Sequence, residues 1–245
     1  MAETAREIAD ELRERIRSGS LAPGTRLPGE PALVREHGVA KETARRALTL
    51  LVNEGLATRR KGSGTYVREF QPIRRVANKR LAEERWNDGR SIWSADIGQR
   101  PMSVSGLRVY EKPAPDDVAQ LLGLEKGAAV VVRDRLFTVE GEPVQAAVSY
   151  LPADLARGSA IAQEDTGAGG IYARLAELGY KPIRFVEEVR ARMPSQDESE
   201  RLHLAEGTPV VEIYRTALTA EGQAVEVNKM LLDAGAYVME YHITG

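Results

Sequence analysis

The stretch LVREHGVAKETARRALTLLVNEGLATRRKGSGTYV, residues 33–67, decides how the first part of this chain folds. It predicts a short helix, a turn at Gly38, a second helix that begins with cations, and a basic hairpin with glycine at its tip. A protein needs this order of parts to place one helix in the major groove of DNA and a loop beside it. The stretch therefore predicts a DNA-binding module.

The second helix of this stretch, expected over 41–53, is amphipathic. Its apolar residues recur at i, i+3, i+4 and i+7, and they are Ala44, Ala47, Leu48 and Leu51. The outer side of its first two turns carries Lys41, Thr43, Arg45 and Arg46. Arg and Lys bind guanine or phosphate, and a Thr hydroxyl bonds to either. We expect these four residues to bind DNA, with a solvated helix face as the alternative.

The hairpin after this helix favours DNA binding. Three adjacent cations, Arg59 to Lys61, run into Gly62-Ser63-Gly64, and residues 65–67 return as a strand. Glycines let the tip approach a sugar-phosphate backbone, and three adjacent cations have no packing role. An ordinary exposed hairpin is the alternative for this segment alone. We expect the DNA contacts of the hairpin to come from Lys61, Gly62, Gly64 and Thr65.

Two further helices are expected before residue 38. Residues 5–18 carry an apolar stripe at helical period, with Thr4 or Glu3 available to cap its start and Gly19 to end it. A shorter helix is expected from 29 or 30 to 37. Three helices and a hairpin thus account for the first 68 residues.

Composition excludes several classes of protein. The chain has 245 residues, of which 42% are hydrophobic and 29% charged, and no stretch approaches the roughly 18 consecutive apolar residues of a membrane span. Because cysteine is absent, there is no disulfide framework and no thiolate zinc site. The histidines, His37, His203 and His242, lack metal-ligand spacing. The start of the chain has no apolar signal core, so we expect a cytoplasmic protein with no membrane partner. We also expect no metal and no cofactor.

Charge is distributed unevenly along the chain. Residues 1–100 carry 20 Lys and Arg against 14 Asp and Glu, a balance of +6, whereas residues 101–245 carry 14 against 22, a balance of −8. A cationic first part joined to an acidic second part indicates that only the first part meets a polyanion.

From residue 104 onward the pattern changes to strands and short helices. Strands are expected over 104–110, 129–139, 144–151, 184–193, 210–219, 224–232 and 237–243, and helices over 116–122, 170–178 and 195–204. Turns at 140–142 and 220–222 join neighbouring strands into antiparallel hairpins. Residues 119–130 and 200–211 are copies of one unit, which predicts an internal repeat with a cleft between its halves. The expected fold class is α+β.

Residues 5–68 resemble the winged helix-turn-helix domain of the GntR family of bacterial transcription regulators. The matching residues include Leu27-Pro28, Glu30, Gly38-Val39, Thr43, Arg45-Arg46-Ala47-Leu48, Glu54-Gly55-Leu56, Lys61-Gly62, Gly64-Thr65 and Val67. The family usually has Ser-Arg where this chain has Ala40-Lys41, and Arg where it has Pro31. The resemblance implies DNA binding, but not an operator sequence borrowed from relatives.

The second part resembles the UTRA effector domain of the HutC subfamily, an antiparallel-sheet fold similar to chorismate lyase. The supporting residues include Arg133, Arg135, Ser149-Tyr150-Leu151-Pro152, Tyr172, Arg215 and Val225-Glu226. Members of the subfamily bind small metabolites between two halves and form homodimers. The resemblance implies an effector site made of Arg133, Arg135, Tyr172 and Glu226. Relatives that hold phosphorylated sugars have Ser in place of Gly170, which implies a less charged or partly apolar effector here.

The residues themselves leave two interpretations of this cluster open. Arg133 and Arg135 lie two positions apart on one strand, so they share a face. Two buried guanidiniums need an anion, which a ligand or the carboxylates of Glu187 and Glu226 would supply. A salt-bridge lattice within the protein is therefore the alternative to a ligand site.

The expected organisation is a DNA-binding domain over 1–68, a linker over 69–85, and an effector-binding and dimerisation domain over 86–245. Trp86 and Trp93 are expected to pin the linker onto the second domain or to flank a ligand. We expect a transcription repressor that binds palindromic double-stranded operator DNA as a homodimer and is released or repositioned by a small molecule.

Two rival functions remain open. One is an effector-independent, plasmid-transfer-type repressor whose second domain only dimerises. The other is a lyase-like metabolite-binding enzyme. No nucleophile beside a base is apparent in the sequence, so we expect no enzymatic activity.

Overall fold

The computed structural model describes residues 4–60, 62–68, 72–77, 81, 93–204 and 206–243. The chain divides into two compact units. The first consists of Met1–Gln71, Met193–Ser199 and Leu204–Pro209, and the second of Pro72–Arg192, Glu200–His203 and Val210–Gly245.

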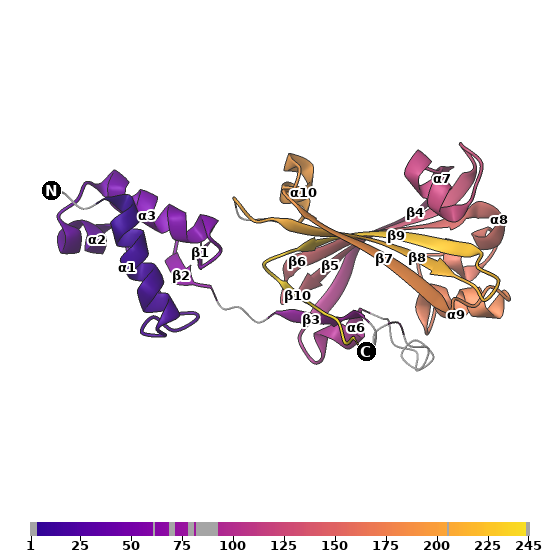
Figure 1. The fold of residues 1–245 in the computed structure, drawn as a ribbon, viewed down its shortest axis with the longest axis horizontal. Helices are drawn as coiled ribbons and strands as arrows, with labels where there is room; N and C mark the ends of the chain where they lie inside the picture. The colour runs from indigo at the N-terminus through magenta and orange to yellow at the C-terminus, as the bar shows by residue number, and fades with distance from the viewer. Residues whose placement is uncertain are drawn as a thin grey trace. The chain divides into compact units, whose positions relative to one another are not determined.

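The first unit begins with three helices and a two-stranded hairpin (Figure 1). The helices are α1 (Ala5–Arg17), α2 (Glu30–His37) and α3 (Lys41–Asn53), and the strands are β1 (Ala57–Arg60) and β2 (Gly64–Val67). Strands β1 and β2 are antiparallel, and Arg26 forms an isolated bridge to Tyr66. The expected helices and hairpin are therefore confirmed.

Local signals in the sequence explain the ends of these helices. The Thr4 backbone N–H donates to Glu7 Oε2 at 2.6 Å, and the Glu7 N–H donates to Thr4 Oγ1 at 3.3 Å, so the two residues form a capping box at the start of α1. Gly38 ends α2 in the left-handed region, with φ of 63°.

Apolar side chains from all three helices form the core of this unit. Ile8, Leu12, Leu33 and Leu51 are fully or almost fully buried in it, and they pack with the inner face of α3. The predicted inner face, Ala44, Ala47, Leu48 and Leu51, is buried in the structure. Because this face is fixed, the opposite side of α3 must face outward.

The second unit is built on a six-stranded antiparallel sheet with strand order β4-β5-β6-β9-β8-β7 (Figure 1). The strands are β4 (Met102–Pro113), β5 (Ala129–Val139), β6 (Glu142–Pro152), β7 (Arg184–Arg192), β8 (Val210–Leu218) and β9 (Ala224–Asp233). The helices are α6 (Ser94–Ile97), α7 (Asp116–Leu122), α8 (Ala153–Ala156) and α9 (Gly170–Glu177), with a 3-10 turn at Ala160–Ala162. Helix α10 (Gln196–Arg201) follows β7, and its first four residues are counted with the first unit. The expected α+β class is confirmed.

The sheet is built from two copies of one structural unit. The first copy runs β4-α7-β5-β6 and the second runs β7-α10-β8-β9, and β6 of the first pairs with β9 of the second at the middle of the sheet. The strand order therefore has the symmetry that the repeated sequence at 119–130 and 200–211 predicts.

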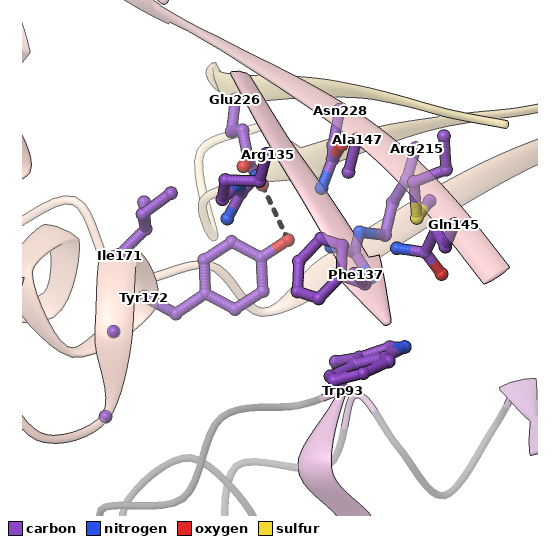
Figure 2. A pocket seen from close by; sticks show the side chains of 13 residues that line it. Trp93, Arg135, Phe137, Gln145, Ala147, Ile171, Tyr172, Arg215, Glu226 and Asn228 are labelled. Carbon is purple, nitrogen blue, oxygen red and sulfur yellow. Dashed lines mark hydrogen bonds between the residues drawn. The ribbon is translucent and has the colours of Figure 1, made fainter. Parts of the chain in front are cut away.

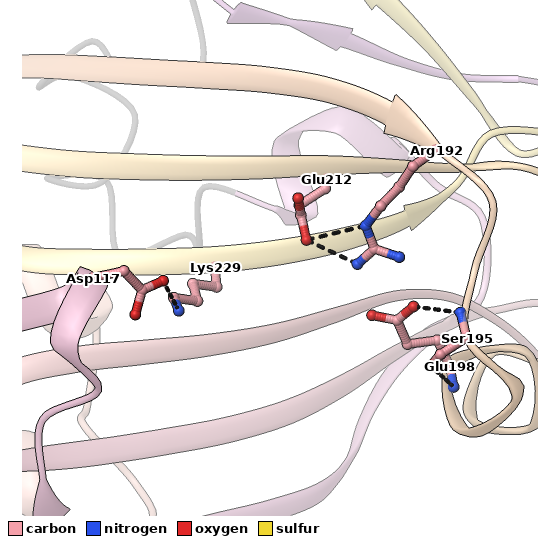
Figure 3. A network of polar contacts seen from close by, with 6 residues as sticks. All are labelled: Asp117, Arg192, Ser195, Glu198, Glu212 and Lys229. Carbon is pink, nitrogen blue, oxygen red and sulfur yellow. Dashed lines mark hydrogen bonds and ion pairs between the residues drawn. The ribbon is translucent and has the colours of Figure 1, made fainter.

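Polar contacts fix one face of the sheet (Figure 3). Lys229 of β9 donates to Asp117 of α7 at 2.6 Å, and α7 covers the apolar side chains of this face. At the other end, Arg192 of β7 pairs with Glu212 of β8 at 2.8 Å. The opposite face is covered by apolar residues of α9 and by Trp93 and Ile97.

One strand was missed by the sequence analysis. Strand β3 (Ile73–Val76) pairs in parallel with β10 (Tyr237–Glu240), within the segment that we expected to be an irregular linker. Four residues with two adjacent arginines carry too short a pattern to predict a strand, because the pairing depends on a partner more than 160 positions away. Trp86 lies outside the described residues. Within the described segments, no helix is long and apolar enough to cross a membrane.

Candidate nucleic-acid interface and ligand pocket

The outer side of α3 is a cationic surface at the start of the helix. Lys41, Arg45 and Arg46 are exposed and Thr43 is half-buried, as the helical spacing requires. Arg45 pairs with Glu42 at 2.7 Å, but both side chains are more than half exposed. Such exposed pairs contribute little, so this one does not prevent Arg45 from binding another anion.

The first turn of α3 adds a partial positive charge to this surface. Ala40 precedes the helix and has no side-chain group to accept from the amides of the first turn. A helix N-terminus that lacks such a cap is suited to a phosphate oxygen, because its amides and its dipole both favour an anion.

The hairpin carries further cations beside a tight turn. Gly62 has φ of 73° and Gly64 has φ of 126°, which residues with side chains rarely adopt. A Cβ on Gly64 would also lie 2.9 Å from Nε of Arg26. Arg60 stacks over the Tyr66 ring at 4.5 Å, and Lys61 lies outside the described residues.

Thr65 is buried, whereas we expected it to contact DNA from the hairpin. Its side chain is only 8% exposed, because it points into the interior from the inner side of β2, and its carbonyl accepts from the Leu27 amide at 2.8 Å. The structure therefore removes Thr65 from the outer surface of the hairpin. Arg26 takes a place there that the sequence analysis missed, because a single Arg before Leu27-Pro28 has no pattern to distinguish it.

The second unit contains a pocket of about 120 Å³ on the α9 side of the sheet (Figure 2). Both halves of the repeat contribute to it, as the predicted cleft requires. Its lining residues are Trp93, Arg135, Phe137, Gln145, Ala147, Gly169, Gly170, Ile171, Tyr172, Arg215, Glu226, Asn228 and Met230. Polar groups come mostly from the sheet, whereas Trp93 and Tyr172 approach from outside it.

Two guanidiniums line this pocket. Burial lowers the pKa of Arg135, and Arg215 lowers it further, although Glu226 opposes the shift. Burial alone would also lower the pKa of Arg215, but Tyr172 and Glu226 outweigh it and the pKa is raised. Both side chains stay cationic at neutral pH, since an Arg begins far above it.

One carboxylate faces these cations. Glu226 is 1% exposed, and its Oε2 accepts a hydrogen bond from the Tyr172 hydroxyl at 2.7 Å (Figure 2). Tyr172 comes from the start of α9 and is itself buried. The structure therefore brings together three of the four residues that the resemblance implied, Arg135, Tyr172 and Glu226.

Arg133 lies elsewhere. It is not among the described residues that line the pocket; its guanidinium donates to the carbonyls of Ile161 at 2.7 Å and Glu164 at 2.8 Å, and also to that of Gln163. Burial, followed by repulsion from Arg135, lowers the pKa of Arg133 to about 10. Arg133 thus holds the backbone segment 161–164 that precedes α9.

A row of polar residues crosses the sheet beside the pocket. Register places Arg133, Ser149, Asn228, Arg215 and Glu187 opposite one another on five neighbouring strands. At the end of the row, Glu187 Oε2 accepts from Nη1 of the Arg75 side chain at 2.8 Å. Arg75 belongs to β3 and is 0% exposed. The polar row therefore connects the pocket with β3, the strand within the expected linker.

Several pocket residues were not predicted. Phe137, Gln145, Asn228 and Met230 reach the pocket through strand register, which the sequence does not reveal. Arg215 was noted as part of the resemblance but not as a site residue. Trp93 was expected either to pack or to flank a ligand. It packs on Phe137, with 4.6 Å between the ring centroids, and it lines the pocket.

Comparison with known families identifies both units. Residues 4–67 match "Bacterial regulatory proteins, gntR family", and residues 99–237, more than half of the chain, match the UTRA domain. The chain belongs to the GntR family. It is a DNA-binding transcription regulator with a UTRA effector domain, the combination that characterises the HutC subfamily.

Relatives and solved structures are similar to this chain along most of its length. An uncharacterized HTH-type transcriptional regulator of Streptomyces coelicolor is 36% identical over 231 residues, which cover 90% of this chain and 85% of the relative. The HTH-type transcriptional repressor NagR of Bacillus subtilis is 26% identical over 97% of this chain and 93% of its own length. A crystal structure of a GntR-family transcriptional regulator matches with a TM-score of 0.64 and 26% identity, over 98% of this chain and 97% of that one.

Proposed function

We propose that this GntR-family protein is a cytoplasmic repressor without enzymatic activity, which binds palindromic operator DNA as a homodimer and leaves it when a small molecule binds the pocket. The observation that carries the proposal is the exposed cationic start of α3, held outward by a buried apolar face. NagR, which is similar along nearly the whole chain, is named a repressor.

In this proposal α3 lies in the major groove. Arg45 and Arg46 contact base edges or phosphates, and Lys41 and Thr43 contact the backbone near the helix start. The hairpin, with Lys61, Gly62 and Gly64, lies against the adjacent backbone or minor groove. Thr65 supports the hairpin from inside.

The homodimer has support from the two edge strands of the sheet. Strands β4 and β7 each pair on one side only within the described sheet, and they expose apolar side chains. Val104 and Tyr110 of β4 are 50% and 41% exposed, and Val186 and Val189 of β7 are 45% and 46% exposed. Exposed apolar edges are costly for a protein that remains a monomer.

The polar row offers a route from pocket to linker. A ligand that binds Arg215 changes the charge beside Glu187, and Glu187 holds Arg75 in β3. Strand β3 lies within the segment 69–85 that we expected to be the linker, so a change in its pairing reaches the segment that joins the two domains. A ligand shifts this equilibrium only by its differential affinity for the two arrangements.

The proposal is tested by footprinting the full-length protein on the upstream region of its own gene, together with its mass in solution from light scattering. A dimer with two protected half-sites about 34–36 Å apart, or a multiple of this spacing, is expected. A monomer with one protected site would contradict the homodimer. Full protection in the presence of every metabolite that binds the pocket would support the effector-independent repressor instead.

A further inference from the structure

We propose that the effector pocket binds a small monocarboxylate with a flat, apolar ring as its body. The inference rests on the proposed function, because it assumes that this pocket is the effector site. It concerns the charge and shape of the ligand, which the family match does not determine.

The first argument comes from donors without acceptors. Nε of Arg135 and both Nε and Nη1 of Arg215 are buried and have no hydrogen-bond partner among the residues that the structure describes. Arg215 is only 5% exposed and lines the pocket. A buried N–H without an acceptor is costly, so these groups favour a ligand that brings oxygen acceptors.

The second argument is the sign of the charge. Arg135 and Arg215 contribute two positive charges to the lining, and Glu226 contributes one negative charge. The N-terminus of the eight-residue helix α9 also faces the pocket through Gly169 and Gly170, and its dipole adds to the positive side. The lining therefore has an excess of about one positive charge, which a monoanion neutralises.

The same balance disfavours a phosphate ester. A phosphate monoester carries about −1.5 to −2 charges at neutral pH, which exceeds the positive excess. Glu226 stays in the lining because Tyr172 donates to it, and it repels a dianion. A carboxylate, with one charge and two acceptor oxygens, matches both the charge and the planar guanidiniums.

The third argument concerns the body of the ligand. Trp93, Phe137 and Met230 form an apolar side of the lining, with the two aromatic rings inclined at 50°. The pocket volume of about 120 Å³ is close to that of an engineered cavity of roughly 150 Å³ that holds benzene. One ring fits beside the cations, and a larger body would have to extend out of the pocket.

The experiment measures binding to the full-length protein by calorimetry and thermal shift. The probes are benzoate and cyclohexanecarboxylate, their neutral amides, acetate and phenyl phosphate. We expect each ring acid to bind at least tenfold more tightly than its amide, and benzoate, whose ring is flat, to bind more tightly than cyclohexanecarboxylate, acetate and phenyl phosphate. Equal affinity of acid and amide, tighter binding of phenyl phosphate, or no binding of either ring acid at millimolar concentration would overturn the inference.

Variants locate the binding. Arg135→Gln and Arg215→Gln should each weaken benzoate binding at least tenfold, whereas Arg157→Gln, a half-exposed Arg paired with Glu111 outside the pocket, should leave it unchanged. Circular dichroism checks that each variant folds. Equal binding by all four proteins would contradict the assigned site.

Operator binding, measured separately, distinguishes this inference from the proposed function. Ring acids that bind the pocket without changing operator affinity would refute effector control but not the ligand class. Loss of operator affinity with another metabolite, but no affinity for ring acids, would refute the ligand class alone.

Discussion

The buried ion pair between Arg75 and Glu187 gives a prediction whose size follows from the structure. Arg75 is 0% exposed and the Glu187 side chain is 10% exposed, so Arg75→Met leaves a carboxylate in the interior without its main partner. Breaking a buried pair by removing one member costs about 3–5 kcal/mol. Arg215 is the cross-strand neighbour of Glu187 and compensates part of this charge, so we expect the lower end, about 3 kcal/mol.

The assay is urea and thermal unfolding of the full-length protein, followed by tryptophan fluorescence. Trp86 and Trp93 are the two tryptophans of the chain, and Trp93 is buried in the second unit. A loss of about 3 kcal/mol corresponds to a fall in Tm of about 6–12 °C for a domain of this size.

The matched control is Arg74→Met, because Arg74 is the adjacent residue on the same strand. Its side chain is 65% exposed and pairs with Glu240 at 3.2 Å, and such a pair contributes about 0–1 kcal/mol. Equal losses of stability in the two variants would refute the burial argument. The double variant Arg75→Met, Glu187→Leu should recover most of the stability, since it removes both charges.

Three further predictions concern single contacts. Tyr172→Phe should lower the free energy of unfolding by about 1.5–3 kcal/mol, because Glu226 loses a buried hydrogen bond. Urea unfolding measures this loss, and an unchanged free energy of unfolding would mean that the hydrogen bond is not formed. Burial raises the pKa of Asp117, but the hydrogen bond from Lys229 outweighs it and the pKa is lowered. The stability that the interaction between Asp117 and Lys229 contributes is therefore present above about pH 4 and is lost below it. Asp117→Asn should reduce the loss of unfolding free energy at acid pH by less than about 1 kcal/mol, since the Asp117 side chain is half exposed. A pH dependence of stability equal to that of wild type would contradict the role of Asp117. Gly64→Ala should cost about 1–3 kcal/mol because its φ is 126°, and thermal unfolding at wild-type Tm would show that the turn accepts a side chain.

Much of the fold could be predicted because its signals are local. The stripe of α3 and the helix cap at Thr4, one of the two candidates, each involve residues within a few positions, and the structure has both. Strand β3 could not be predicted, because it exists through pairing with β10 at the other end of the chain. Pairing between distant segments leaves no periodic trace in a four-residue strand.

The two candidate sites also contain some residues that local patterns predict and others that they do not. The outward position of Arg45 follows from helical spacing, and the shared face of Arg133 and Arg135 follows from strand alternation. Alternation does not determine how far along the face the pocket extends, so Arg133 was expected in it although it binds backbone carbonyls. Thr65 was assigned to the surface because its neighbours are basic, whereas the pleat of β2 turns it inward.

The most direct test of DNA binding by α3 is the affinity of Arg45→Ala for the footprinted upstream DNA and for unrelated DNA at several salt concentrations. The control is Arg17→Ala, an exposed Arg at the end of α1. We expect Arg45→Ala to lose about 1–3 kcal/mol of operator affinity, with relaxed preference at one base pair, and Arg17→Ala to behave as wild type. Operator affinity and salt dependence of Arg45→Ala equal to those of wild type would contradict the position of α3 in the groove.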